Sequence, residues 1–72
     1  MEKEIVEYNL VSGMGKIDIT FNNVFLGKVL TEKQMMNRVQ KLVNELRLFS
    51  KKSSFVLYKD VGGTSVKLVS FI

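Results

Sequence analysis

The side chains with the clearest potential for chemistry are the basic and amide residues between Thr31 and Ser53. This stretch carries six cations and two carboxylates, so the whole net charge of +4 lies in it and the other residues are neutral overall. Such side chains bond phosphates and the edges of nucleic-acid bases. The candidate contact residues are Lys33, Asn37, Arg38, Lys41, Asn44, Arg47, Lys51 and Lys52. The pattern favours a surface that follows a nucleic-acid backbone or groove.

A charged helix face also has a simpler interpretation, in which it is only solvated. Lysine and arginine are good helix formers, and cations near the end of a helix offset its dipole. Asn37 and Asn44 are poor helix formers, however, which favours a surface kept for contact. Two hypotheses follow. The first, which the segregation of the charge favours, is a small nucleic-acid-associated regulator or accessory factor. The second is a protein-interaction module, such as an inhibitor or adaptor, that binds an acidic partner or uses an open face or edge of its sheet.

Enzymatic chemistry is poorly supported by the residue types. The sequence has no histidine and no cysteine, which removes the imidazole base, the thiolate nucleophile and the soft metal ligands. Glu7 and Asp18 are expected on one face of neighbouring strands, where pairing with nearby lysines explains them. The sequence GMGK at residues 13–16 contains only part of a phosphate-binding loop and lies between two strands. We therefore expect a binding protein with no catalytic residue, cofactor or metal.

The cations need an element to position them, and residues 31–49 form the most periodic segment of the chain. Its apolar residues fall within an arc of roughly 140° at 100° per residue, the width of a helix face that packs on a core. These residues are Met35, Met36, Val39, Leu42, Val43, Leu46 and Phe49. Thr31 and Gln34 have the spacing of a capping box. We predict an amphipathic helix from Thr31 to Phe49, with its basic side in solvent.

The rest of the chain alternates in the manner of β-strands. Strands are predicted at residues 4–11, 16–21, 55–61 and 64–72, and a weaker return strand at 24–30, where Gly27 marks a bulge or a bend. Turns are predicted at residues 12–15, 22–23 and 62–63. Because short connections pair adjacent strands antiparallel, the fold class is α+β. We expect one domain over residues 1–72, with an antiparallel sheet of four to five strands, one amphipathic helix on one face, and the order β-β-(β)-α-β-β.

One helix can cover only one face of this sheet. The alternation places Val11, Val69 and Phe71 on the opposite face, and a contiguous exposed apolar patch is typical of an interface. We therefore hypothesise a homodimer, either through the sheet face that carries these three residues or through an edge strand at the C-terminus. The alternative is a scatter of apolar side chains of the kind that any protein surface carries.

The sequence carries no signal for a membrane or for export. No apolar run reaches the roughly 18 residues of a membrane span, and the acidic N-terminus MEKEIVEYNL is unlike a signal peptide. The absence of cysteine fits a reducing compartment. We expect a cytoplasmic protein whose partner is a nucleic acid or an acidic protein, and not a membrane.

Overall fold

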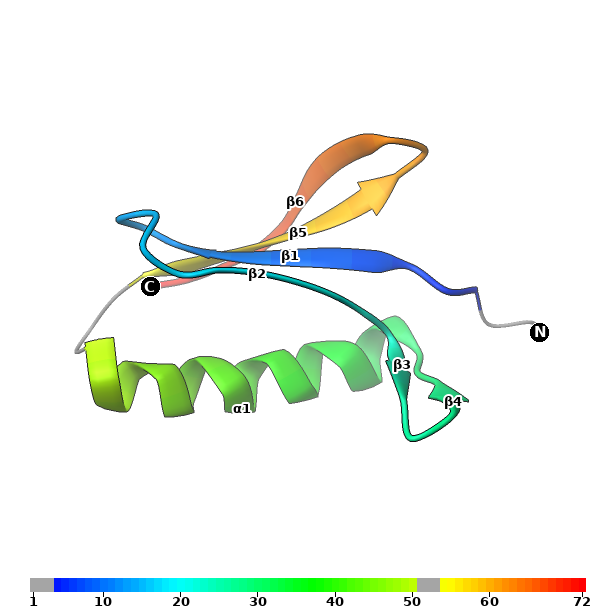
Figure 1. Ribbon diagram of the computed structural model, residues 1–72, viewed down its shortest axis with the longest axis horizontal. Helices are drawn as coiled ribbons and strands as arrows, with labels where there is room; N and C mark the ends of the chain where they lie inside the picture. Colours follow the sequence, from blue (N-terminus) through cyan, green and yellow to red (C-terminus); the bar gives the residue numbers. More distant parts are fainter. Residues whose placement is uncertain (1–3, 51–53) are drawn as a thin grey trace.

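The computed structural model describes residues 4–50 and 54–72. It has two layers, an antiparallel sheet and one helix that runs along one face of the sheet (Figure 1). The sheet contains β1 (Glu7–Ser12), β2 (Asp18–Asn22), β5 (Phe55–Val61) and β6 (Thr64–Phe71), in the order β2-β1-β5-β6. The helix is α1 (Glu32–Ser50), and β3 (Val24–Phe25) and β4 (Lys28–Val29) form a small separate hairpin between β2 and α1. The predicted α+β class is confirmed, and so is the predicted order of elements, except that a two-stranded hairpin takes the place of the single third strand.

The core lies between α1 and the face of the sheet that α1 covers. The register pairs Leu10 with Leu57 and Ser12 with Phe55 across the two central strands, and all four residues are buried. The buried apolar residues are Tyr8, Leu10, Met35, Val39, Val43, Phe55, Leu57 and Phe71. Their spacing of two in β1 and β5 and of four in α1 is the period that places side chains on one face of each element.

The helix begins where the sequence predicts. The Thr31 N–H donates to Gln34 Oε1 at 2.9 Å, and the Gln34 N–H donates to Thr31 Oγ1 at 3.2 Å, which confirms the capping box. The other end differs from the prediction, because Phe49 is 85% exposed and lies outside the core. At 100° per residue, Phe49 is roughly 80° round the helix from the buried Val39, at the margin of the apolar arc.

The register of β6 overturns the predicted oligomer face. β5 and β6 pair Phe55 with Phe71, but the register shifts part-way along the strands, where Leu68 is the extra residue of a bulge. A bulge breaks the alternation of side chains, so an unbroken period of two misplaces one half of the strand. Phe71 is in the core and Val69 packs against it, whereas Val11 alternates with the core residues of β1. The prediction that Val11, Val69 and Phe71 share an exposed face is wrong, and homodimerisation stays a prediction.

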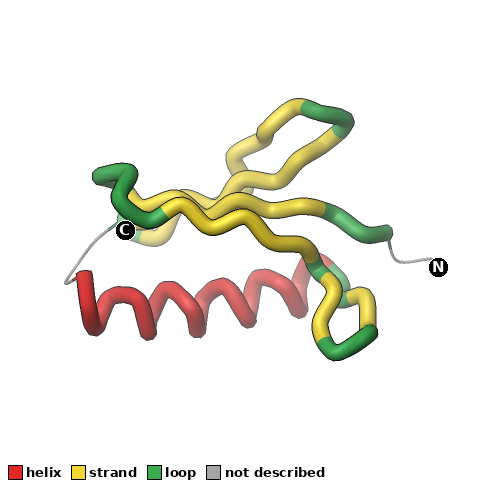
Figure 2. Tube along the Cα trace, viewed as in Figure 1, coloured by secondary structure: helices red, strands yellow, loops and turns green. Residues whose placement is uncertain are grey.

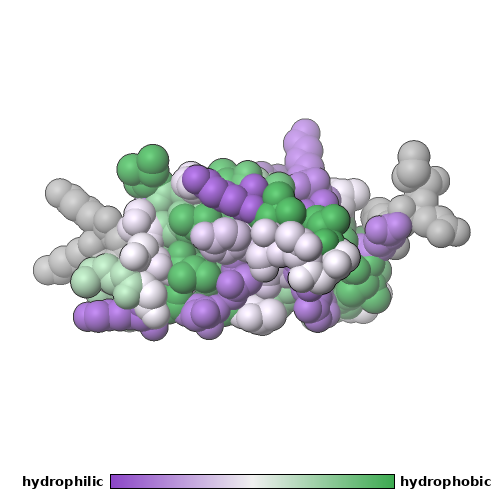
Figure 3. Space-filling model, turned by 90° about the horizontal axis from the view of Figure 1, so that it is seen from above, coloured by the Kyte–Doolittle hydropathy of each residue, from purple (hydrophilic) through white to green (hydrophobic). Residues whose placement is uncertain are grey.

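The open face of the sheet carries a mixture of hydrophilic and hydrophobic side chains (Figure 3). Asn9 Nδ2 donates to Asp18 Oδ1 at 2.6 Å and lies 3.4 Å from Thr20 Oγ1, which links β1 to β2 on this face. Val11 and Val56, its apolar residues on the two central strands, are paired with each other and half-buried. Hydrophilic side chains interrupt the hydrophobic ones across the face in Figure 3, so the described part of it lacks the continuous apolar area that is typical of an interface.

Residues 23–30 leave the sheet instead of returning along β2 (Figure 2). The predicted turn at residues 22–23 and the predicted return strand are therefore wrong, although Gly27 does mark a bend. The chain reverses at Leu26-Gly27, where φ is 51° and 77°, and Phe25 pairs with Lys28. Positive φ at both central residues is the geometry of a two-residue type I′ turn.

Asn23 explains why the chain leaves the sheet here, because its side chain is 3% exposed and connects three segments. Its Oδ1 accepts a hydrogen bond from the Val6 N–H at 2.9 Å, and its Nδ2 donates to the carbonyl oxygens of Glu4 and Leu30 at 2.8 and 2.9 Å. The Leu30 N–H donates to the Asn23 carbonyl oxygen at 2.7 Å. A buried amide needs such partners, so Asn23 determines where the hairpin leaves the sheet and where the chain re-enters toward α1.

Candidate interaction groove

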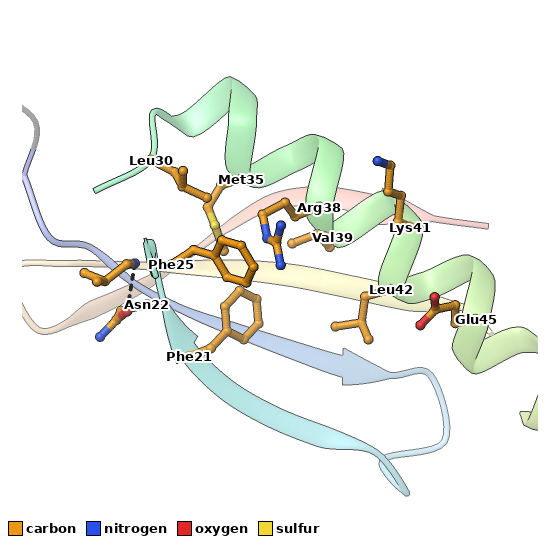
Figure 4. Close-up of a pocket in the computed structure, with 11 residues that line it drawn as sticks. Phe21, Asn22, Phe25, Leu30, Met35, Arg38, Val39, Lys41, Leu42 and Glu45 are labelled. Atoms are coloured by element: carbon orange, nitrogen blue, oxygen red, sulfur yellow. Dashed lines mark hydrogen bonds between the residues drawn. The ribbon is translucent and has the colours of Figure 1, made fainter. Parts of the chain in front are cut away.

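A groove runs between α1 and the side of the molecule formed by β2 and β3 (Figure 4). The sheet ends at β2 and the β3–β4 hairpin is separate from it, so one flank of α1 is left uncovered. The groove has a volume of about 440 Å³, which is within the range of ligand-binding clefts. Its apolar lining comes from Phe21, Val24, Phe25, Leu30, Met35, Val39 and Leu42, and its polar lining from Asn22, Arg38, Lys41 and Glu45.

Two aromatic rings line the side of the groove across from α1. The Phe21 ring stacks on Tyr8, with ring centres 5.9 Å apart and planes 16° apart, which attaches it to the core. Phe25 is 41% exposed, and the guanidinium carbon of Arg38 lies 3.5 Å from the centre of its ring. Figure 4 shows both rings and Leu42 directed into the same space. The arrangement places a cation at the mouth of an apolar groove.

The hairpin that carries Phe25 also presents a second apolar side chain. Leu26 occupies the first central position of the turn with a φ of 51°, and it is 84% exposed. The left-handed conformation is disfavoured for leucine, and asparagine, aspartate or glycine are the usual residues at this position. Phe25 and Leu26 therefore form an exposed apolar tip beside the groove.

The predicted cations separate into two groups on α1. Arg38 and Lys41 line the groove, although Lys41 extends away from the two rings (Figure 4). Lys33 and Arg47 lie roughly 140° and 180° round the helix from Arg38, at 100° per residue. Lys33 is exposed and Arg47 is half-buried. The described cations of the helix therefore spread over roughly 180° of its circumference, with Lys41 between Arg38 and Lys33.

The predicted amide contacts lie away from the groove. Asn37 and Asn44 are exposed, and Asn44 Oδ1 accepts a hydrogen bond from Gln40 Nε2 at 3.2 Å along the same side of α1. Lys51 and Lys52 fall outside the described residues. Of the residues predicted to make contact, the structure brings Arg38 and Lys41 to one site and leaves the other described ones elsewhere on the helix.

The carboxylates do not form a reactive pair in the described parts of the chain. Glu7 and Asp18 lie on the open face of the sheet, as predicted, but the register sets Glu7 opposite Asn22 and Asp18 opposite Val11, at opposite ends of the β1–β2 ladder. The described residues hold no group of three or more potential metal ligands. Among them there is also no helix long and apolar enough to cross a membrane.

Tyr8 is a buried titratable group beside the start of α1, and it is 2% exposed. Burial raises the pKa of its phenol, and the Glu32 carboxylate raises it further. Glu32 also lies 3.9 Å from Lys59 Nζ. A phenol with a raised pKa stays protonated at neutral pH, so Tyr8 acts here as a packing residue of the core.

Phe21 and Phe25 are site residues that the sequence analysis did not identify. The available signal was the sequence FLG at residues 25–27, in which two large apolar residues precede the glycine of a tight turn. Comparisons with models of protein families, with curated proteins and with solved structures find no match for this chain. A function is therefore inferred from the geometry of the groove.

Proposed function

We propose that this chain is a non-enzymatic protein-interaction module that binds an acidic segment of a partner protein in the groove between α1 and the β2–β3 side. The observation that carries the proposal is Arg38, held 3.5 Å from the Phe25 ring centre at the edge of an apolar groove. An apolar groove gains free energy when apolar side chains enter it. A guanidinium at its mouth favours a carboxylate, which it can bond in a bidentate manner.

The hairpin tip supports the same proposal. Leu26 is 84% exposed at a φ of 51°. A left-handed conformation costs a residue with a side chain about 1–2 kcal/mol, which glycine avoids. An exposed leucine at this position therefore lowers the stability of the free chain without adding contacts in the core. This cost favours the interpretation that the Leu26 side chain contacts a partner.

Nucleic-acid binding through the helix is the alternative, and the net charge of +4 and the isoelectric point of about 9.6 support it. Binding to a phosphate backbone gains from each phosphate that a cation neutralises, so it favours cations on one side. Arg38 and Lys33 point in directions roughly 140° apart on the helix, with Lys41 between them, so the cations are spread over a wide arc and not concentrated along a narrow line. Glu45, a carboxylate that repels phosphate, borders the groove together with Arg38 and Lys41. These features favour a protein partner.

Selection of random dodecapeptides displayed on phage, with the full chain as the target, tests the proposal. We expect the enriched peptides to combine large apolar residues with a surplus of aspartate and glutamate. Synthetic copies should bind the chain in a fluorescence anisotropy titration. Arg38→Glu should weaken that binding at least about tenfold, equivalent to about 1.4 kcal/mol.

Lys33→Glu is the matched control, because it makes the same change of charge on the flank of α1 away from the groove. The affinity of Lys33→Glu for the peptides should stay within about twofold of the affinity of the unaltered chain, since a distant surface charge contributes little to affinity. Enriched peptides without acidic residues would contradict the proposal. So would tight binding of a DNA or RNA oligonucleotide at low salt that both variants weaken equally, because that result favours the helix as a nucleic-acid surface.

A further inference from the structure

The edge of the sheet at β2 exposes backbone groups in a regular array. The Ser12 N–H donates to the Ile17 carbonyl oxygen at 2.8 Å, which makes these residues a hydrogen-bonded pair of the β1–β2 ladder. In an antiparallel ladder such pairs alternate with non-hydrogen-bonded pairs. Ile19 and Phe21 therefore direct their backbone groups toward β1. Asp18, Thr20 and Asn22 alternate with these two residues. Their N–H and C=O groups point away from β1, outward from the edge of the sheet.

This edge differs from the opposite one. Within the described residues β2 pairs with β1 alone, and its five pairs run without a register shift. β6, the other edge strand, carries a bulge in its pairing with β5. Bulges and prolines are devices that protect sheet edges from further pairing. β2 contains neither, and so presents the more regular of the two edges to a partner.

The edge and the groove adjoin each other. Phe21 and Asn22 belong to β2 and line the groove, and the groove continues from them to Arg38 and Leu42 on α1. A strand placed beside β2 would direct alternate side chains toward the groove and the others toward the open face of the sheet. A residue of the added strand that faces the groove near Arg38 would contact the guanidinium. Residues of that strand near Phe21 and Leu42 would contact apolar side chains.

We propose that the partner segment binds as a fifth strand on the edge of β2, with every second side chain in the groove. This inference rests on the proposed function and defines its ligand: an extended acidic segment about as long as β2, with apolar residues alternating along it and a carboxylate facing Arg38. Its backbone bonds the free groups of Asp18, Thr20 and Asn22, which supplies affinity, while the groove supplies specificity. The net charge of +4 is complementary to an acidic occupant.

Thr20→Pro tests this mode, with Thr20→Val as the matched control. Proline removes the Thr20 N–H, which points away from β1, so the β1–β2 ladder keeps its hydrogen bonds and an edge strand tolerates the change. Valine loses the same hydroxyl but keeps the N–H. With the acidic peptides selected by phage display as probes, Thr20→Pro should weaken binding at least tenfold and Thr20→Val less than twofold.

Hydrogen exchange in the unaltered chain gives an independent measurement that does not depend on a folded proline variant. Saturation with the same peptide should slow exchange of the Asp18, Thr20 and Asn22 amides several-fold. Unchanged exchange at all three would overturn strand addition. Protection of the same amides in the free chain, together with a dimer in sedimentation, would also overturn it, because the edge would then be occupied by a second copy.

The outcomes separate this inference from the proposed function. If Arg38→Glu weakens peptide binding and Thr20→Pro does not, the peptide enters the groove without pairing to β2, and the strand mode alone is wrong. If neither variant changes the binding, the groove is not the site and both proposals are wrong. If both weaken it and their controls do not, both proposals are supported.

Discussion

The guanidinium carbon of Arg38 lies 3.5 Å from the centre of the Phe25 ring, and this contact connects α1 to the β3–β4 hairpin. The hairpin is separate from the main sheet, and the hydrogen bonds between Asn23 and Leu30 hold its two ends together. A cation over an aromatic face is attracted by the ring quadrupole. The contact therefore fixes both the charge at the mouth of the groove and the side of the groove that Phe25 forms.

A double-mutant cycle should detect this contact in the stability of the free chain. Phe25→Leu and Arg38→Met keep apolar bulk at both positions but remove the ring and the charge. We expect a coupling of about 0.5–1 kcal/mol in the free energy of unfolding, the value of exposed cation–π pairs. Urea denaturation of the four proteins measures it. The same cycle with Lys33→Met should give no coupling, and equal coupling in both cycles would show that the ring contact is not the cause.

Phe71, at the end of β6, and Phe49, in the last turn of α1, should respond very differently to truncation. Phe71→Ala should destabilise the chain by about 3–5 kcal/mol, because it leaves a cavity in the core, and Phe71→Leu should cost less. Phe49→Ala should change stability by no more than about 0.5 kcal/mol, since Phe49 is 85% exposed. Urea midpoints of the three variants measure the difference. A large loss at Phe49 together with a small loss at Phe71 would contradict the register of β6.

The sequence predicts those features whose causes are local. Thr31 and Gln34 are three residues apart, and their reciprocal hydrogen bonds form as the spacing indicates. Gly62-Gly63 adopts φ of 58° and 85°, as a primed turn between two predicted strands requires. The helix, the main strands and the antiparallel pairing follow from signals of this kind, and they account for most of the fold.

Features with distant causes were not predictable. Asn23 suits a turn by residue type, but its partners Val6 and Glu4 are 17 and 19 residues away in the chain, and they hold it buried. The bulge in β6 depends on its pairing with β5, so periodicity within β6 alone misplaces Phe71. The groove arises where the sheet stops short of one flank of α1, and no single segment encodes that. Arg38 was predicted from its charge, and Phe25 could not be paired with it.

Asn23→Ala should be among the most damaging polar substitutions. It removes an acceptor for the Val6 N–H and donors to the carbonyl oxygens of Glu4 and Leu30, so we expect a loss of about 2–4 kcal/mol in the free energy of unfolding. Asn22→Ala is the control. Its exposed side chain accepts one bond, from the Val24 N–H at 2.9 Å, and its loss should cost no more than about 1 kcal/mol. Equal losses in urea denaturation would show that Asn23 does not connect these segments.

The stability of the chain should decline in alkali partly because of Tyr8. Burial first, and the Glu32 carboxylate second, raise the pKa of its phenol in the folded state above the reference value of 10.0. The unfolded chain therefore loses this proton first. The contribution of the neutral phenol to the free energy of unfolding is fully present below about pH 10, and it is lost as the pH rises through the folded-state pKa.

Tyr8→Phe isolates this effect, because it keeps the buried ring and removes the ionisable group. Between about pH 8 and about pH 11 the original chain should lose more free energy of unfolding than Tyr8→Phe, since the unfolded tyrosine ionises in that window. Glu32→Gln should show an intermediate loss, because burial is the larger of the two causes. Urea titrations at each pH give the free energies of unfolding. Lysine deprotonation affects the original chain and Tyr8→Phe alike, so parallel losses in these two proteins would show that the buried phenol does not couple folding to pH.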